Sequence, residues 1–240
     1  MKPLVRWTIG PVLPRGFKSL ELSVESVKTF YPECDLLICY NQLKDHQLER
    51  VKSLGIKMFD QEQPILPSPK DGYRFEWKIC PPRLRLESHE IIIDNDIILF
   101  QNVPEIDRFL NDDNVLFSQG LWELYGRYQD KIPAGMRVNA GLFGMPPNFD
   151  FAERASEFTD DILGGIEEFD EQGLVTATLL QSPNYYMISQ TSITILEDWM
   201  SIRPILSNPL CCGAHFVGIN YKEKHSAWDE YHRSLGVKFI

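Results

Sequence analysis

One stretch decides the fold: Glu90-Ile91-Ile92-Ile93-Asp94-Asn95-Asp96-Ile97-Ile98-Leu99-Phe100, an almost continuous apolar run with three polar residues in its middle. Such a run is typical of a strand buried on both faces, as the central strands of α/β sheets are. A buried carboxylate costs several kcal/mol unless something compensates it. We therefore expect Asp94 and Asp96 where the strand emerges, facing a cation. The alternative is a polar strand end with an Asx turn at Asn95 and Asp96, which the absence of Gly and Pro disfavours.

Length and composition favour one α/β domain. The chain has 240 residues, 43% of them hydrophobic and 12% aromatic, so it can bury a full core. We expect a single domain over residues 1–240 with no separate module. The formal net charge of -10 disfavours a nucleic-acid partner, which needs a basic surface to neutralise phosphates. A small anionic ligand remains compatible with a bound metal ion and a few local Lys or Arg.

From the sequence we expect neither a signal peptide nor a membrane span. The segment from Met1 to Trp7 lacks an apolar signal core, and no later stretch reaches the length of a span. We therefore expect a cytoplasmic protein with no membrane span. The five cysteines follow no regular framework; they are Cys34, Cys39, Cys80, Cys211 and Cys212. Since Cys39 lies in an apolar strand-like run, buried reduced thiols suit this pattern better than disulfides.

The beginning of the chain predicts a βαβαβ unit. Hydrophobic periodicity indicates alternating strands and helices at residues 4–9, 17–31, 35–40, 43–53 and 56–59. Such a unit implies a parallel sheet with right-handed crossovers and a ligand crevice at the carboxyl ends of its strands. The expected fold class is α/β, a Rossmann-like, mostly parallel sheet flanked by helices.

Further elements are expected along the rest of the chain. Prolines at 64, 67 and 69 predict a loop over 60–72, followed by a helix from about Tyr73 that Pro81-Pro82 interrupts. The later expected elements are a helix at 104–110, strands at 115–118 and 138–143, and helices at 149–162, 171–181 and 195–201. An acidic run is interpreted as a solvated face; its members are Asp160, Asp161, Glu167, Glu168 and Asp170.

Four short motifs accompany the Asp-x-Asp pair. Lys78 precedes Asp94 by sixteen positions, and the run Val138-Asn139-Ala140-Gly141-Leu142-Phe143 follows. The chain then reads Glu171-Gln172-Gly173-Leu174 and His215-Phe216-Val217-Gly218. Each has an ordinary structural explanation by itself, such as a solvated lysine or a core histidine. Together they resemble the GT-A nucleotide-sugar glycosyltransferases, most nearly glycosyltransferase family 8, whose members include glycogenin and bacterial galactosyltransferases.

The resemblance runs from the first strand to about Trp228 and implies a metal-dependent transfer of a sugar from a nucleotide diphosphate sugar. It implies that Asp94, Asp96 and His215 bind a divalent cation, and this set of oxygen and nitrogen ligands suits Mn²⁺ (or Mg²⁺). It implies that Gln172 and Glu171 act at the transferred sugar. Residues expected to bind the nucleotide sugar are Thr8, Ile9, Gly10, Lys78, Asp94, Asn139, Gly141, Gly218 and Lys222.

The family also suggests the donor and the stereochemistry. A UDP-sugar is the expected donor, while the acceptor, a glycan, lipid or protein, stays open. Transfer is expected to retain the anomeric configuration through front-face attack, in which the acceptor proton passes to the departing phosphate. A covalent intermediate on Glu171 is the alternative.

The chain departs from the family pattern in three places. Glu171 replaces an Asp, Pro81-Pro82 interrupts the helix of Lys78, and Tyr221-Lys222-Glu223-Lys224 stands where Lys-Pro-Trp normally follows the histidine motif. The missing Lys-Pro-Trp leaves open a second function, a catalytically silent domain that binds sugar nucleotide or glycan.

Other readings of the same residues are weaker. A haloacid-dehalogenase-like phosphatase would have Thr or Val where Ile98 stands, and a sugar nucleotidyltransferase would have a Gly-rich N-terminal loop with Arg. A zinc site would draw on Cys211, Cys212, His215, His225 and His232, but adjacent cysteines lack the usual spacing of thiolate ligands. Several aromatic residues could stack on a sugar or pack in the core; they are Trp199, Phe216, Tyr221, Trp228 and Tyr231.

Overall fold

The computed structural model describes residues 1–62, 76–159 and 169–237, and the chain divides into two compact units. The first unit contains Met1–Pro11, Glu33–Asp94 and Pro104–Ile188. The second contains Val12–Pro32, Asn95–Val103 and Ser189–Ile240. The Asp-x-Asp motif therefore lies where the chain passes from the first unit to the second.

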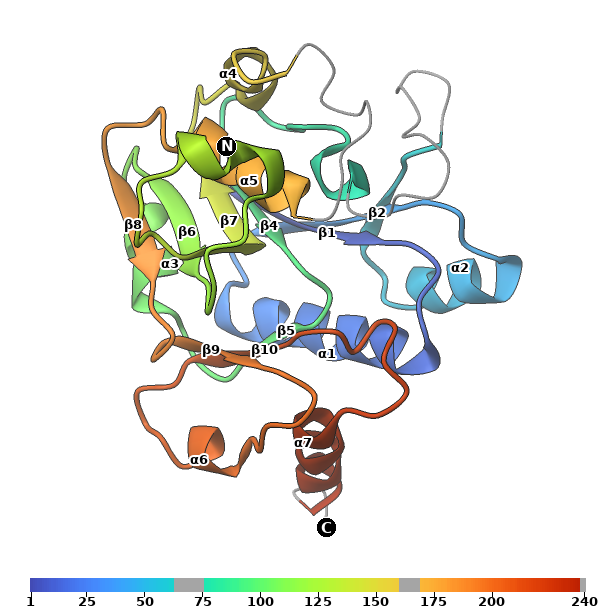
Figure 1. Cartoon of the computed structure of the whole chain (residues 1–240). Coiled ribbons are helices and arrows are strands. Elements are labelled where there is room, and N and C mark those ends of the chain that lie inside the picture. The colour runs from blue at the N-terminus through green and yellow to red at the C-terminus, as the bar shows by residue number, and fades with distance from the viewer. Residues whose placement is uncertain (63–75, 160–168, 238–240) are drawn as a thin grey trace. The chain divides into compact units, whose positions relative to one another are not determined.

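A seven-stranded sheet forms the centre of the first unit, with strand order β3-β2-β1-β4-β7-β6-β8 (Figure 1). Its strands are β1 (Leu4–Ile9), β2 (Asp35–Tyr40), β3 (Lys57–Asp60), β4 (Glu90–Ile93), β6 (Val115–Gln119), β7 (Val138–Met145) and β8 (Tyr185–Ile188). The pairs β3-β2, β2-β1, β1-β4 and β6-β8 are parallel, and β7 runs antiparallel to β4 and β6. The expected mostly parallel sheet is confirmed.

Helices flank this sheet and cover its core. They are α2 (Asp45–Lys52), η1 (Glu76–Ile79), α3 (Pro104–Phe109), η2 (Gly126–Lys131), α4 (Phe151–Ala155) and α5 (Asp170–Leu179), where η marks a 3₁₀ helix. Helix α5 packs on β7, and Leu174 lies in one apolar cluster with Phe117, Phe143 and Phe151. Burying each such side chain contributes about 1.5–3 kcal/mol. Gly173 lets α5 lie close to the backbone at Tyr125, because a Cβ at Gly173 would meet the Tyr125 carbonyl.

The second unit combines a long helix with a small sheet. Its elements are α1 (Pro14–Phe30), the strands β5 (Ile97–Leu99), β9 (Ile193–Leu196) and β10 (Gly213–Phe216) in the order β5-β10-β9, α6 (Arg203–Leu206) and α7 (Ser226–Val237). Proline at the first position of α1 suits a helix start, where the backbone N–H has no partner anyway. Helix α1 packs on β5, and Ser26 Oγ accepts a 3.1 Å hydrogen bond from Leu99 N.

Several sequence predictions need correction. The run from Glu90 to Phe100 forms two strands in two sheets, because the chain turns at Asn95 and Asp96. The helix expected at 195–201 is wrong: Ile193–Leu196 is a β-branched strand that pairs in parallel with β10. The helix expected over 149–162 begins only at Phe151 and ends at Ala155.

Parts of four predictions lie outside the described residues. These are most of the loop at 60–72, the helix start near Tyr73, the end of the helix expected over 149–162, and Asp160, Asp161, Glu167 and Glu168 of the acidic run. The described part of the Tyr73 helix is the single 3₁₀ turn η1, after which Pro81 and Pro82 cannot donate helical hydrogen bonds.

All five cysteines are buried and in the reduced form, as predicted. Within residues 1–62, 76–159 and 169–237, no helix has both the length and the apolar character needed to cross a membrane.

Candidate functional site

Asp94 directly follows β4, a strand buried at every position. Its backbone N–H donates a 2.6 Å hydrogen bond to the Gly141 carbonyl of the neighbouring strand β7. The antiparallel pairing of Ile93 with Leu142 accounts for this contact. Asn139, also on β7, accepts a 2.8 Å hydrogen bond from Gly141 N through its side-chain oxygen. Three predicted binding residues thus lie together at one sheet edge.

Lys78 joins this group from η1. Its Nζ lies 2.8 Å from Asp94 Oδ1 and 3.6 Å from Glu171 Oε1, and it donates a 3.2 Å hydrogen bond to the Ala140 carbonyl. Only 13% of the lysine side chain is exposed. Lys78 is therefore not a solvated lysine, and its expected contact with the nucleotide sugar stays a prediction.

Glu171 is a buried carboxyl at the start of α5. Burial raises its pKa from 4.5 to about 7, because a charge that loses its water is disfavoured. The nearby positive charge of Lys78 lowers this pKa in part, and the negative charge of Asp94 raises it further. Near neutral pH the group can hold a proton or release it.

The side chain of Gln172 is fixed at both ends. Its Nε2 donates a 2.6 Å hydrogen bond to the Leu124 carbonyl, and its Oε1 accepts a 3.2 Å hydrogen bond from Ala140 N. Since Ala140 lies between Asn139 and Gly141, these contacts connect Gln172 to the β7 motif. The amide is thereby held on the Ala140 backbone, whose carbonyl also accepts from Lys78.

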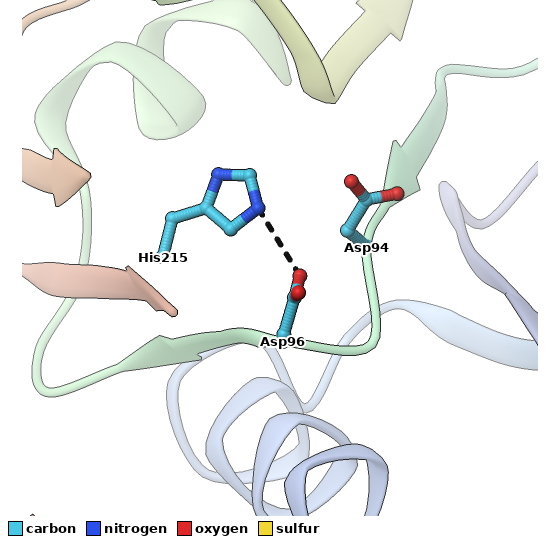
Figure 2. A group of neighbouring side chains, drawn as sticks. All are labelled: Asp94, Asp96 and His215. Atoms are coloured by element: carbon cyan, nitrogen blue, oxygen red, sulfur yellow. Dashed lines mark ion pairs between the residues drawn. The ribbon is translucent and has the colours of Figure 1, made fainter. Parts of the chain in front are cut away.

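Asp96 and His215 form an ion-pair contact in the second unit. His215 Nε2 lies 3.1 Å from Asp96 Oδ1, and both side chains are buried. Phe216 N donates a 2.9 Å hydrogen bond to the Asp96 carbonyl, and β10 pairs with β5 next to it, with His215 opposite Ile97. Figure 2 shows this pair as a dashed line, with Asp94 at the end of β4.

Asp94 completes a group that can bind a metal ion. It stands two residues before Asp96, and one ligand atom from each of Asp94, Asp96 and His215 lies within 4.8 Å of the others (Figure 2). Two carboxylates and an imidazole suit Mn²⁺, and the carboxylates suit Mg²⁺. Among the described residues this is the one such group of His, Cys, Asp or Glu, which gives no support to the zinc alternative.

Gly218 and Lys222 share a tight turn after β10. Gly218 has a φ of +90°, a conformation that favours glycine, and its carbonyl accepts a 2.9 Å hydrogen bond from Lys222 N. A Cβ at Gly218 would lie 3.0 Å from the Lys222 side-chain carbons. Lys222 Nζ lies 3.1 Å from Asp198 Oδ1, with about a third of each side chain exposed.

The segment from Thr8 to Gly10 ends β1 in the first unit. Asn41 N donates a 3.1 Å hydrogen bond to the Ile9 carbonyl, which keeps β1 and β2 together at their carboxyl ends. A Cβ at Gly10 would lie 3.0 Å from Asn41 Oδ1, so a larger residue would crowd that side chain. No described contact joins Thr8 or Gly10 to Lys78, Asp94 or Glu171.

Two polar residues have structural contacts that the sequence did not indicate. Gln61 is fully buried and its Nε2 donates to the Trp77 carbonyl at 2.6 Å and to the Cys80 carbonyl at 2.5 Å, at the two ends of η1. It therefore orients the turn that carries Lys78. Asp170, interpreted as part of a solvated face, is buried and lies 2.6 Å from Arg127 Nη2. No local pattern marks either contact.

The aromatic residues divide into two classes. Phe216, Trp228 and Tyr231 are buried and pack against one another, with ring centroids 5.3–6.2 Å apart. Trp199 and Tyr221 are exposed. Packing in the core therefore explains the first three, and of these five residues the last two are exposed to solvent.

Solved glycosyltransferase structures are similar to this chain. The galactosyltransferase LgtC in complex with donor and acceptor sugar analogues matches with TM-score 0.60 and 12% identity, over 97% of this chain and 94% of that one. GlyE of Streptococcus pneumoniae TIGR4 matches with TM-score 0.55 and 14% identity, over 96% and 60%. Mouse xyloside xylosyltransferase 1 matches with TM-score 0.52 and 12% identity, over 92% and 99%.

No protein-family model and no curated protein matches the chain. At the identities of the solved structures, the likeness establishes the fold alone. Together with the strand order and the Asp-x-Asp motif after β4, it confirms the resemblance found in the sequence. The chain therefore has the fold of the GT-A glycosyltransferases.

Proposed function

We propose that this protein is a glycosyltransferase that moves a sugar from a nucleotide diphosphate sugar to an acceptor, with Mn²⁺ or Mg²⁺ as cofactor. The observation that carries the proposal is the group of Asp94, Asp96 and His215 in a GT-A fold, in which the two aspartates follow the buried strand β4 and His215 lies on β10. We propose further that residues 1–240 act as a single catalytic domain.

A divalent cation bound there would act as a Lewis acid that stabilises the negative charge growing on the departing diphosphate. Backbone hydrogen bonds hold the ligand residues in place before a cation binds, so binding costs little conformational entropy. Phe216 N holds the Asp96 carbonyl, and Gly141 O holds Asp94 N, so both aspartates are oriented by backbone hydrogen bonds. His215 adds a neutral nitrogen ligand when its ring is not protonated.

Lys78 has two roles in this proposal. It places a positive charge 2.8 Å from Asp94 Oδ1, and it offsets the charge of Glu171 nearby. The Gln172 amide, held by Leu124 and Ala140, stabilises the cationic sugar as the bond to the diphosphate breaks. Glu171 stands beside the same sugar, where its elevated pKa limits its charge near neutral pH.

The donor is proposed to lie along the remaining predicted residues. Thr8, Ile9 and Gly10 at the end of β1 hold the base and ribose, Asn139 and Gly141 face the sugar, and Gly218 and Lys222 meet the diphosphate. Gly218 supports this role because glycine adopts its φ of +90° without strain, which allows the tight turn that carries Lys222. A UDP-sugar is the donor proposed, and transfer is proposed to retain the anomeric configuration.

A thermal-shift and calorimetry panel tests the proposal. The wild type is titrated with UDP, GDP and ADP, each with Mn²⁺ and with excess chelator. We expect one nucleotide diphosphate to bind with Mn²⁺ and to raise the unfolding free energy by about 2.7 kcal/mol at one hundred times its Kd. Equal affinity in chelator would remove the metal from the proposal.

A silent sugar-nucleotide binder is the second candidate. It is favoured by the missing Lys-Pro-Trp and by the contact of Lys222 with Asp198, which already uses the lysine charge. A screen of nucleotide sugars with Mn²⁺ and no acceptor separates the two functions, because water can enter a site that stabilises the leaving diphosphate. Slow release of free sugar supports the enzyme, and tight binding without release supports the binder.

A further inference from the structure

Asn95, the middle residue of the Asp-x-Asp motif, directs its side chain into the second unit. Its Nδ2 donates a 2.7 Å hydrogen bond to Asn220 Oδ1 and a 3.0 Å hydrogen bond to the Gly16 carbonyl. Asn220 Nδ2 in turn donates a 3.0 Å hydrogen bond to Asn95 Oδ1. The two amides thus exchange a pair of hydrogen bonds, and only 5% of Asn95 is exposed. These partners are distant in sequence, unlike those of an Asx turn.

The backbone at both asparagines is held as well. Ser19 Oγ donates a 2.8 Å hydrogen bond to the Asn95 carbonyl, and Leu13 N donates a 3.0 Å hydrogen bond to the Asn220 carbonyl. Gly16 leaves room for this arrangement, since a Cβ there would lie 2.5 Å from Asn220 Oδ1. The first turns of α1 are therefore the common support for both asparagines.

Each asparagine is next to residues of the proposed site. Asn95 immediately precedes Asp96, whose carbonyl accepts from Phe216 N and whose carboxylate lies 3.1 Å from His215 Nε2. Asn220 lies between Gly218 and Lys222 in the turn that those two residues close. The amide pair therefore connects the segment of one metal ligand with the turn proposed to meet the diphosphate.

We propose that Asn95 and Asn220 are a positioning pair, which sets Asp96 against His215 and ties the 218–222 turn to the metal ligands. The part of this inference that concerns metal binding rests on the proposed function. The pair makes cation binding and the geometry of the diphosphate turn mutually dependent, because a shift of either asparagine breaks the hydrogen bonds of both. An Asp-x-Asp motif does not by itself require an amide in the middle position.

The experiment uses the full chain with Asn95→Ala, Asn220→Ala and the double variant. Asn102→Ala is the matched control, because Asn102 Nδ2 also donates to a carbonyl of α1, that of Phe30, at 2.9 Å and at the other end of the helix. The first readout is amide hydrogen exchange at Phe216 N and Lys222 N without ligand. The second is Mn²⁺ affinity measured by the electron paramagnetic resonance of the free ion, well below the melting temperature.

Both single variants are expected to exchange Phe216 and Lys222 amides about 3- to 10-fold faster and to weaken Mn²⁺ binding by a similar factor, while the control changes neither. The double variant is expected to resemble the weaker single variant, since the two residues share their hydrogen bonds. In donor turnover, the Mn²⁺ concentration for half-maximal rate should rise while kcat at saturating Mn²⁺ returns toward the wild-type value.

Three other results are informative. Faster exchange with unchanged Mn²⁺ affinity would overturn the proposal and leave the pair a purely structural feature. Additive losses in the double variant, or equal losses in the Asn102 control, would also overturn it. A wild type that binds no Mn²⁺, with accelerated Phe216 exchange in both variants, would refute the proposed function but support the positioning of Asp96.

Discussion

Lys78 Nζ lies 2.8 Å from Asp94 Oδ1, so a lysine on a short 3₁₀ turn neutralises the first aspartate of the Asp-x-Asp motif. The same ammonium lies 3.6 Å from the buried Glu171. One positive charge thus serves two carboxylates, and its removal would leave both without their cation.

Lys78→Met is therefore expected to destabilise the protein. Breaking a buried pair by removal of one partner costs about 3–5 kcal/mol, and the partial exposure of this group reduces the expected loss to about 1–3 kcal/mol. The loss should be larger at pH 8 than at pH 5, where Glu171 holds its own proton. Urea unfolding at both pH values measures it, with Lys52→Met on the exposed face of α2 as control. An equal loss at the two values would contradict the shared role of Lys78.

Glu171→Gln should change the pH dependence of stability. The folded pKa of about 7 lies above the ordinary 4.5, so between these values the folded protein holds a proton that the unfolded chain has released. The stability contributed by this group is therefore fully present below about pH 4.5 and is lost as pH rises from there to about 7. The variant cannot ionise, and at pH 8 it should exceed the wild type by an amount on the order of 3 kcal/mol.

Denaturant unfolding from pH 4.5 to 8 checks this expectation. The exposed Glu87 supplies the control, as Glu87→Gln should leave the slope unchanged. A wild type and a Glu171→Gln variant with parallel curves would show that the carboxyl is ionised in the folded protein throughout this range.

The sequence was most informative where structure follows from local periodicity. The strands at Leu4–Ile9 and Asp35–Tyr40 have the predicted bounds, because apolar runs between turn residues need no distant partner to be recognised. Prediction was wrong at Ile193–Leu196, where a strand depends on its pairing with β10, a contact that local propensity does not contain. The division of the Glu90 run between two sheets has the same origin.

The site shows the same limit. The interval between Lys78 and Asp94 could be compared with a family pattern, and the two side chains lie 2.8 Å apart. Gln61, which holds both ends of η1, has no neighbouring signal in sequence. Asp170 was misinterpreted because its partner Arg127 is distant in the chain, and an acidic run alone favours solvent.

Asp96→Asn and His215→Ala test the cation site. Each removes one ligand, and Asn has nearly the volume of Asp, so the fold of Asp96→Asn in particular should persist. Mn²⁺-dependent nucleotide binding should weaken by more than about 100-fold in both, since loss of a residue that only supports a metal ligand already costs 10- to 100-fold in metal affinity. Calorimetry measures the binding and circular dichroism the fold. Asp229→Asn and His232→Ala, exposed on α7, are the matched controls. Unfolding of either site variant would identify its residue as structural.

Asp198→Asn tests whether Lys222 meets a diphosphate. The 3.1 Å contact with Asp198 competes for the lysine charge, and about a third of each side chain is exposed, so the pair contributes little to stability. We expect Asp198→Asn to bind the nucleotide diphosphate about 2- to 5-fold more tightly, because the charge of Lys222 is released from its exposed ion pair. Lys222→Met should bind it more weakly, because that charge is lost. Weaker binding in Asp198→Asn would show that the aspartate orients the lysine toward the ligand.

The stereochemistry of transfer rests on the position of Gln172. Its amide is fixed by Leu124 and Ala140 next to the Lys78 group, and the described carboxyl there, Glu171, is buried with a raised pKa. An inverting enzyme needs a carboxylate base that activates the acceptor opposite the leaving group, whereas front-face transfer gives the acceptor proton to the phosphate. We therefore expect an α-linked donor to yield an α-linked product. Gln172→Ala should lower kcat strongly and Glu171→Gln less, and proton NMR of the first product, recorded before mutarotation, decides the configuration. A β product would show that a base outside this group activates the acceptor, even if the cation site binds as proposed.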